Sequence, residues 1–177
     1  IADNSLWHYA TKHLNKTVTS ALIILGGLGY IVWWDVLRVI KSRSPKNRKI
    51  FRHLTLHSKI AITATAGLIL VGAILIFAFE YANPLTIGEM SLFDKIQVSF
   101  FQSVTTRTAG FATVPQENLT NASAAVSIIL MLIGGSPVGT AGGMKTVTIA
   151  VLICSAFATI RNKNSATLFG RRISEES

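Results

Sequence analysis

The stretch F-F-Q-S-V-T-T-R-T-A-G-F, residues 100–111, decides how the rest of this chain is interpreted. An amphipathic run ends there in hydroxyl side chains, a single glycine follows, and long apolar segments flank the unit on both sides. A cation crossing hydrocarbon must exchange its water shell for other oxygens. The carbonyls of an extended loop can supply them, whereas helical carbonyls are already hydrogen-bonded. The stretch therefore predicts an ion-selecting loop, and an ordinary polar loop between helices is the alternative.

As a selectivity filter, this loop would present four backbone carbonyls to the ion, and Gly110 would let the chain turn without a Cβ clash. The four predicted ion-binding residues are Thr106, Thr108, Ala109 and Gly110. Arg107 interrupts them, and a guanidinium facing the path would repel a cation. We therefore expect its side chain to point away and to bind carbonyls or an acidic residue of a neighbouring segment.

The composition is that of a membrane protein. Of 177 residues, 50% are hydrophobic and 14% are charged, against roughly 25% charged residues in soluble domains. The start at Ile1 suggests a piece of a longer polypeptide, and the single cysteine, Cys154, has no internal disulfide partner. The net charge is +9, and the stretch between Asp35 and Glu80 holds eight basic residues but no acidic one. Beside a membrane span, the preference for positive loops on the cytoplasmic side explains this run more simply than nucleic-acid binding does.

Two apolar spans precede the filter stretch. Residues 18–40 are long enough to cross hydrocarbon and are interrupted by G-G-L-G, residues 26–29, which we expect to be a packing face for a neighbouring helix. Residues 60–80 form the second span and end before Pro84. The basic residues of segment 42–59 lie between the two spans, so this segment is placed in the cytoplasm.

A short helix is predicted at residues 91–105. Ser91 and Asp94 have the spacing of a capping box, and the apolar stripe is Phe93, Ile96, Phe100, Phe101 and Val104. Fifteen residues extend about 22 Å, enough to dip halfway into a bilayer. A re-entrant helix of this kind points the negative end of its dipole at the bilayer centre, where it favours a cation. A helix lying on the outer surface is the alternative.

The last apolar region, residues 122–160, would measure about 58 Å as one helix and must therefore be broken. The break is G-G-S-P-V-G-T-A-G-G, residues 134–143, and Lys145 follows it. Unwound backbone at membrane depth lines a cavity or is buried in protein, so we expect the loop to face the ion path with Lys145 as a positive barrier. Snorkelling, or capping of loop carbonyls, is the alternative for Lys145. A phosphate-binding P-loop is excluded because Met144 replaces the required glycine and no strand precedes the motif.

These motifs resemble a known family. S-V-T-T-R-T-A-G-F, residues 103–111, followed by I-G-G-S-P-V-G-T-A-G-G-M-K-T, residues 133–146, is similar to the Trk/Ktr/HKT potassium transporter superfamily, and most of all to its Ktr membrane subunit (KtrB). The segment L-G-G-L-G-Y-I-V-W, residues 25–33, resembles the second helix of the preceding pore repeat in the same family.

The resemblance implies four helix, pore-loop, helix repeats in one polypeptide, each with one filter glycine, of which this chain holds the end of the second and all of the third. It implies K+ as the transported ion, Na+ as a second candidate and no organic cofactor. The expected partners are the remaining repeats, a second copy in a homodimer, a cytoplasmic ring of nucleotide-binding regulatory subunits and the lipid bilayer. The implied gate residues are Gly134, Gly135, Ser136, Pro137, Gly139, Thr140, Gly142, Gly143 and Lys145.

The expected fold is an all-α integral membrane protein with a potassium-channel-like helix, re-entrant pore loop, helix repeat and a broken final helix. Residues 1–41 are an extracytoplasmic segment and the preceding repeat's last helix, and residues 42–59 are a cytoplasmic loop. Residues 60–160 form the complete repeat (helix 60–80, pore helix 91–105, filter 105–111, broken helix 122–160), and 161–177 a cytoplasmic tail. A secondary transporter with a midplane site and a non-transporting assembly subunit are the alternatives. No spacing suggests an enzyme.

Overall fold

The computed structural model describes residues 13–41, 50–137, 139, 142–161, 167–168 and 171–172. The helices are α1 (His13–Gly27), α2 (Tyr30–Lys41), α3 (Ile50–His53), α4 (Leu56–Glu80), α5 (Leu92–Thr105), the 3-10 helix η2 (Gln116–Asn118), α6 (Asn121–Leu132) and α7 (Thr146–Ile160). Strands β1 (Thr167–Leu168) and β2 (Arg171–Arg172) pair antiparallel. Residues 1–12 of the predicted extracytoplasmic segment, residues 42–49 of the basic loop and most of the C-terminal tail lie outside the described residues.

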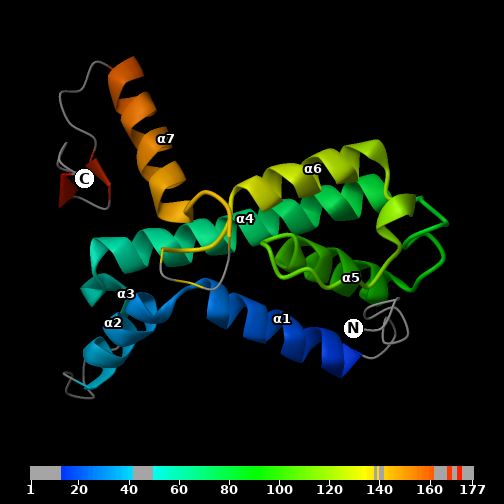
Figure 1. The fold of residues 1–177 in the computed structure, drawn as a ribbon, viewed down its shortest axis with the longest axis horizontal. Helices are drawn as coiled ribbons and strands as arrows, with labels where there is room; N and C mark the ends of the chain where they lie inside the picture. The colour runs from blue at the N-terminus through cyan, green and yellow to red at the C-terminus, as the bar shows by residue number, and fades with distance from the viewer. Residues whose placement is uncertain are drawn as a thin grey trace.

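Helix α4 is the centre of the fold. It packs against α2, α5, α6 and α7, and Figure 1 shows α6 along one side of it and α5 along the other, with α1 beyond α5. By length and hydropathy, α4 is the one described helix that could cross a bilayer alone, and α1 with α2 meets the same criterion only as a bent pair. The helix begins one turn before the predicted start at residue 60. The Thr55 side chain accepts a hydrogen bond from the Ser58 amide, 3.3 Å, and so begins the helix at Leu56.

The first predicted span is not one straight helix. α1 and α2 meet at 90°, and Gly29 sits between them with φ +75°, a left-handed conformation that a glycine adopts without strain. α2 then returns to α4, where the buried Asp35 carboxylate accepts hydrogen bonds from the Thr55 amide at 2.7 Å and the Thr55 hydroxyl at 2.9 Å. The glycines of this segment therefore end one helix and turn the chain into the next. The expectation of a packing face did not include this bend.

Small residues allow α5 and α6 to approach α4 closely. A Cβ on Gly72 of α4 would overlap the hydroxyl of Ser103 in α5 and would lie 2.6 Å from a methyl of Leu130 in α6. The Ser103 hydroxyl donates to the Ile69 carbonyl at 2.8 Å, so the two helices are also joined by a buried hydrogen bond. The C-terminal half of α5 is consequently held by α4.

Helix α5 begins as its sequence predicts, because the Ser91 hydroxyl accepts the Asp94 amide at 3.3 Å. Its predicted apolar stripe is only partly buried within this chain. Phe101 and Val104 are buried, but Phe93 and Ile96 are more than half exposed. Polar residues take their place in the interior, since the buried face of α5 also includes Ser99, Gln102, Ser103 and Thr105.

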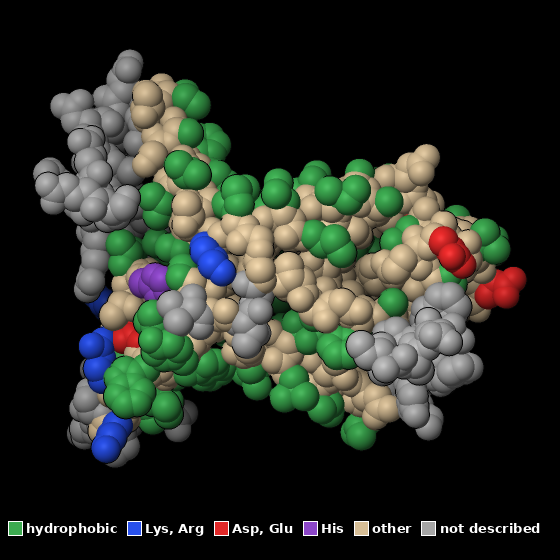
Figure 2. Space-filling model, viewed as in Figure 1, with side chains coloured by type: hydrophobic (Ala, Val, Ile, Leu, Met, Phe, Trp, Pro, Cys, Tyr) green, Lys and Arg blue, Asp and Glu red, His purple; other side chains and the backbone are tan. Residues whose placement is uncertain are grey.

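The last apolar region is broken, and α6 and α7 are not collinear. Figure 1 shows α7 turned away from the line of α6, with the described part of the connecting loop (residues 133–137, 139 and 142–145) between them. Charge is separated along the molecule. In Figure 2 basic side chains gather at the end that holds α2, where Arg38, Lys41 and Arg52 are exposed. Acidic side chains lie at the opposite end, where Glu89 and Glu117 are exposed.

Candidate functional site

The last carbonyls of α5 are all used within the chain. The Gln102 carbonyl accepts the Thr106 amide at 3.1 Å, and the Val104 carbonyl accepts the Arg107 amide at 3.2 Å. The Ser103 carbonyl accepts the Thr106 hydroxyl at 2.9 Å, and the Thr105 carbonyl accepts the Ala109 amide at 3.0 Å. The helix end is thus satisfied up to Thr105.

The next carbonyls differ. Those of Thr106, Thr108, Ala109 and Gly110 lie beyond the helix, in a segment that is held by the side chains of Thr105, Arg107 and Thr108. These are the four carbonyls that the sequence selects as ion ligands. They follow directly on the C-terminal end of α5, where the helix dipole favours positive charge.

Thr105 closes this segment into a loop, a role that the sequence analysis missed. Its hydroxyl donates to the Phe111 carbonyl at 2.6 Å and accepts the Phe111 amide at 2.9 Å. The two bonds bring residues on either side of the predicted filter together. A threonine beside a glycine-containing loop is the only sequence signal for such a clamp, and it is a weak one.

The backbone inside this loop is left-handed at two positions. Thr108 has φ +67° and Gly110 has φ +78°. For a β-branched residue this conformation is a genuine outlier, which costs about 1–3 kcal/mol and is typical of functional sites. A Cβ built on Gly110 meets nothing within 4 Å, so its backbone conformation, and not a lack of space within this chain, is what requires glycine.

The glycine-rich loop after α6 is closed at its base. Ile133 and Met144 form a parallel bridge, the Met144 amide donates to the Leu132 carbonyl at 2.9 Å, and the Thr146 amide donates to the Gly135 carbonyl at 3.0 Å. A Cβ on Gly134 would overlap the carbonyl oxygen of Gly142. The two limbs of the loop therefore lie in backbone contact.

The loop also docks on the end of α1. The buried Ser136 donates its amide to the Gly27 carbonyl at 2.9 Å, and a Cβ on Gly139 would lie 2.8 Å from the same oxygen. The last carbonyls of a helix have no partner within it, so the loop satisfies one that the break in the first span leaves open. Pro137 is half-buried, Gly143 has φ +72°, and Thr140 lies outside the described residues.

Two adjacent residues of the predicted filter segment bind this loop. The buried Arg107 donates from Nη2 to the Gly134 carbonyl at 3.0 Å and to the Thr146 hydroxyl at 3.1 Å. The Thr108 hydroxyl accepts the Gly142 amide at 2.9 Å. The expectation that Arg107 binds carbonyls of a neighbouring segment is confirmed in these contacts.

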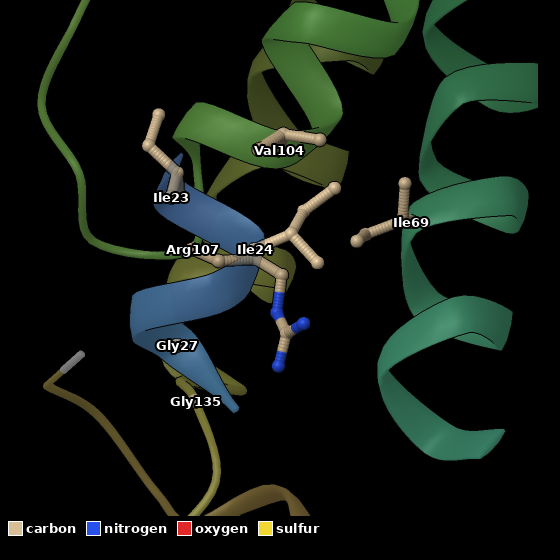
Figure 3. A pocket seen from close by; sticks show the side chains of 7 residues that line it. All are labelled: Ile23, Ile24, Gly27, Ile69, Val104, Arg107 and Gly135. Atoms are coloured by element: carbon tan, nitrogen blue, oxygen red, sulfur yellow. The ribbon is translucent and has the colours of Figure 1, made fainter. Parts of the chain in front are cut away.

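Figure 3 shows the surroundings of Arg107, with its side chain extended between α1 and α4. A cavity of about 10 Å³ lies beside it, lined by apolar side chains of α1, α4 and α5 together with Gly27 and Gly135. This is the space of about one water molecule. No acidic side chain forms an ion pair with Arg107 among the described residues. Its charge is therefore compensated by the acceptors of the loop.

Lys145 is the residue immediately before α7, half-buried, with its carbonyl accepting the Ile149 amide at 3.1 Å. A cation at a helix N-terminus meets the positive end of the helix dipole. Stabilisation of α7 by the dipole therefore does not explain why lysine occupies this position.

Glu80 is a second residue that the sequence analysis missed. Its buried carboxylate accepts the Thr86 hydroxyl at 2.6 Å, the Asn83 amide group at 2.7 Å, and the Thr120 amide and hydroxyl at 2.8 and 2.7 Å. These bonds join the C-terminus of α4 to the N-terminus of α6, where a negative charge is favourable. Glu80 thereby fixes the end of the fold opposite the glycine-rich loop.

Comparison with known proteins identifies the family of this chain. The pattern of the family described as "TrkH: Cation transport protein" matches residues 1–176. The chain belongs to this family. This TrkH-family chain is 38% identical over 156 residues to the potassium/sodium uptake protein NtpJ of Enterococcus hirae, covering 88% of the chain and 32% of that protein. It is 34% identical over 171 residues to the Ktr system potassium uptake protein B of Bacillus subtilis, covering 97% of the chain and 36% of that protein.

The fold agrees with a solved structure of the family. The potassium transporter TrkH of Vibrio parahaemolyticus superposes with a TM-score of 0.76 at 15% sequence identity, covering 98% of this chain and 36% of that one. At this identity the likeness shows the fold alone. The chain spans about a third of the length of the relatives that it matches. The predicted family, the helical fold and the assignment to a family of membrane transport proteins are thus confirmed.

Proposed function

We propose that this chain is the third pore repeat, with the end of the second, of a potassium uptake transporter, and that residues 106–110 form one quarter of its selectivity filter. The observation that carries the proposal is the end of helical hydrogen bonding at Thr105. Carbonyls up to Thr105 are hydrogen-bonded within the chain, and those of Thr106, Thr108, Ala109 and Gly110 follow in a non-helical segment whose backbone is left-handed at Thr108 and Gly110. Such oxygens can replace the water shell of a K+ ion.

The proposed filter does not place a positive charge on its own carbonyls. The Arg107 guanidinium is engaged by Gly134 and Thr146, on the side of the glycine-rich loop. The negative end of the α5 dipole adds a favourable field for a cation beside the loop. Both features support cation selection over anion binding.

The glycine-rich loop is the proposed gate. Its limbs touch each other, its tip region contacts the end of α1, and Thr108 of the filter binds Gly142. Lys145 supplies a positive charge at the base of this loop, at a position where α7 gains nothing from it. The interruption between Leu132 and Thr146 argues against a plain assembly helix, for which a continuous helix is expected.

The complete protein is proposed to contain the other pore repeats, to form a homodimer and to bind a cytoplasmic ring of nucleotide-binding regulators. This extension rests on the resemblance to Ktr membrane subunits and on relatives named as Ktr system potassium uptake proteins. The relative named as a potassium/sodium uptake protein keeps Na+ as a second candidate ion. The basic end at α2 is proposed to face the cytoplasm, because positive charge accumulates on that side of a membrane.

Ion flux through the full-length transporter tests the filter. A Gly110→Val change forces a β-branched residue into a left-handed conformation in the carbonyl segment, and we expect the preference for K+ over Na+ to fall. The measurement is 86Rb+ uptake into proteoliposomes in competition with each ion. Gly27→Ala is the matched control, since a Cβ there meets nothing within 4 Å. Unchanged selectivity in a folded Gly110→Val protein would remove the filter assignment.

Unidirectional flux also tests the gate. Lys145→Met, which keeps the length of the side chain and removes its charge, is expected to raise K+ flux in the resting state. If resting K+ flux through the Lys145→Met transporter stays as low as in the original sequence, Lys145 is not a barrier to the ion. A midplane site for an organic anion, the secondary-transporter alternative, is favoured instead if uptake of K+ depends on a co-transported carboxylate.

A further inference from the structure

One side chain joins both ends of the glycine-rich loop. Arg107 Nη2 donates to the carbonyl of Gly134, just after α6, and to the hydroxyl of Thr146, the first residue of α7. The Thr146 hydroxyl in turn donates to the Gly134 carbonyl at 2.8 Å. Three groups from three segments thus form a closed triangle of hydrogen bonds at the base of the loop.

The triangle is enclosed and offers the guanidinium few alternatives. Arg107 is 6% exposed and Thr146 is 1% exposed. The neighbouring cavity of about 10 Å³ has room for about one water molecule. Hydrogen bonds from a charged donor are about twice as strong as neutral ones, and removing such a buried donor leaves the Gly134 carbonyl and the Thr146 hydroxyl with only the bond that they make to each other.

The residue after Arg107 makes a second contact with the same loop. The Thr108 hydroxyl accepts the Gly142 amide, while the Thr108 backbone is held at φ +67°. Because this conformation is unfavourable for a β-branched residue, the surrounding contacts must support it. The hydrogen bond from Gly142 is one of those contacts, so the shape of the proposed filter and the position of the loop depend on each other.

We propose that Arg107 is a positioning residue that latches the glycine-rich loop closed against the filter segment. Opening of the loop separates the start of α7 from the end of α6 and withdraws the Gly134 and Thr146 acceptors from the guanidinium. The filter then loses the support of the loop on Thr108. The effect of the latch on transport rests on the proposed gate. Whether Arg107 holds the loop in place does not, and it is measured separately.

Hydrogen–deuterium exchange of the full-length transporter in lipid nanodiscs measures the latch. The reporters are backbone amides of residues 133–146, of which Ser136, Met144 and Thr146 donate hydrogen bonds within or beside the loop. Arg107→Gln is expected to raise their exchange about tenfold. Arg107→Lys keeps the charge and a nitrogen that can donate to both acceptors, but it shortens the side chain and loses the rigid guanidinium, so we expect an intermediate rise.

A second pair of variants leaves Arg107 in place. Thr146→Val removes the hydroxyl from the triangle while keeping the side-chain shape, and loop exchange is expected to rise. Thr159→Val is the matched control, because the Thr159 hydroxyl bonds only the Ser155 carbonyl of its own helix α7. Exchange of the α4 amides is the internal reference for intact folding. If one of the two variants, Arg107→Gln or Thr146→Val, does not fold, the loop exchange of the other variant tests the latch.

Faster loop exchange in Arg107→Gln and Thr146→Val, with α4 and Thr159→Val unchanged, supports the latch. Folded Arg107→Gln or Thr146→Val protein with the loop exchange of the original sequence overturns it. Flux of 86Rb+ by the same samples then separates the two proposals. If the loop is loosened and resting flux stays low, the latch stands and the assignment of the loop as the gate fails.

Discussion

The chain breaks two apolar segments with glycine-rich sequences, and the two breaks work differently. At residues 26–29 the glycines end α1 and turn the chain by 90° into α2, and a Cβ on Gly27 would meet open space. At residues 134–143 glycine is required by close contact, since a Cβ on Gly134 would overlap the Gly142 carbonyl. The first break depends on backbone conformation and the second on backbone packing. Similar composition therefore serves a bend in one place and a docked loop in the other.

The largest effect is expected at the packed break. Gly134→Ala places a methyl group where the Gly142 carbonyl lies, so the two limbs of the loop must separate. Overpacking of this kind costs about 3 kcal/mol. Thermal unfolding of the full-length protein should show a lower midpoint, and loop amides should exchange faster. A Gly134→Ala protein with unchanged midpoint and exchange would mean that the limbs do not touch.

A smaller effect is expected at the bend. Gly29→Ala forces an L-residue to φ +75° and should cost about 1–2 kcal/mol. The loss should be visible in the same unfolding experiment, without an increase in exchange at residues 133–146. If Gly29→Ala loosens the loop as strongly as Gly134→Ala, the bend and the loop form one unit and the contrast between them disappears.

The smallest effect is expected at Gly27. A Cβ there has room, and alanine is favoured over glycine within a helix by about 0.5–1 kcal/mol. Gly27→Ala should leave the unfolding midpoint unchanged or raise it slightly, since its carbonyl still accepts the Ser136 amide. A clear loss of stability would show that the loop packs more tightly on α1 than the contacts indicate.

Much of the fold was predictable because long apolar runs and end signals are local. The capping residue Ser91 and the break after Leu132 follow directly from sequence, and the resemblance identified the family. The bend at Gly29 was missed because an apolar run with glycines fits a packed straight helix equally well. The sequence did not show which part of the apolar stripe is buried, since α5 turns serines and Gln102 to its interior while Phe93 and Ile96 stay exposed.

The site was predicted only in its outline. The carbonyl segment and the loop were recognised by residue type, whereas the groups that join them come from distant positions. Thr105 and Thr146 look like ordinary threonines until the chain brings them to Phe111 and Arg107. Contacts between segments about 30–40 residues apart in sequence, such as Arg107 with Thr146 and Thr108 with Gly142, carry no local signature.

The most direct test of the account is an experimental structure of the full-length transporter with bound Rb+, located by its anomalous scattering. The account predicts an ion facing the carbonyls of Thr106, Thr108, Ala109 and Gly110, with those oxygens free of hydrogen bonds to protein. The account would be contradicted if these carbonyls accepted hydrogen bonds from another repeat and the ion were bound elsewhere.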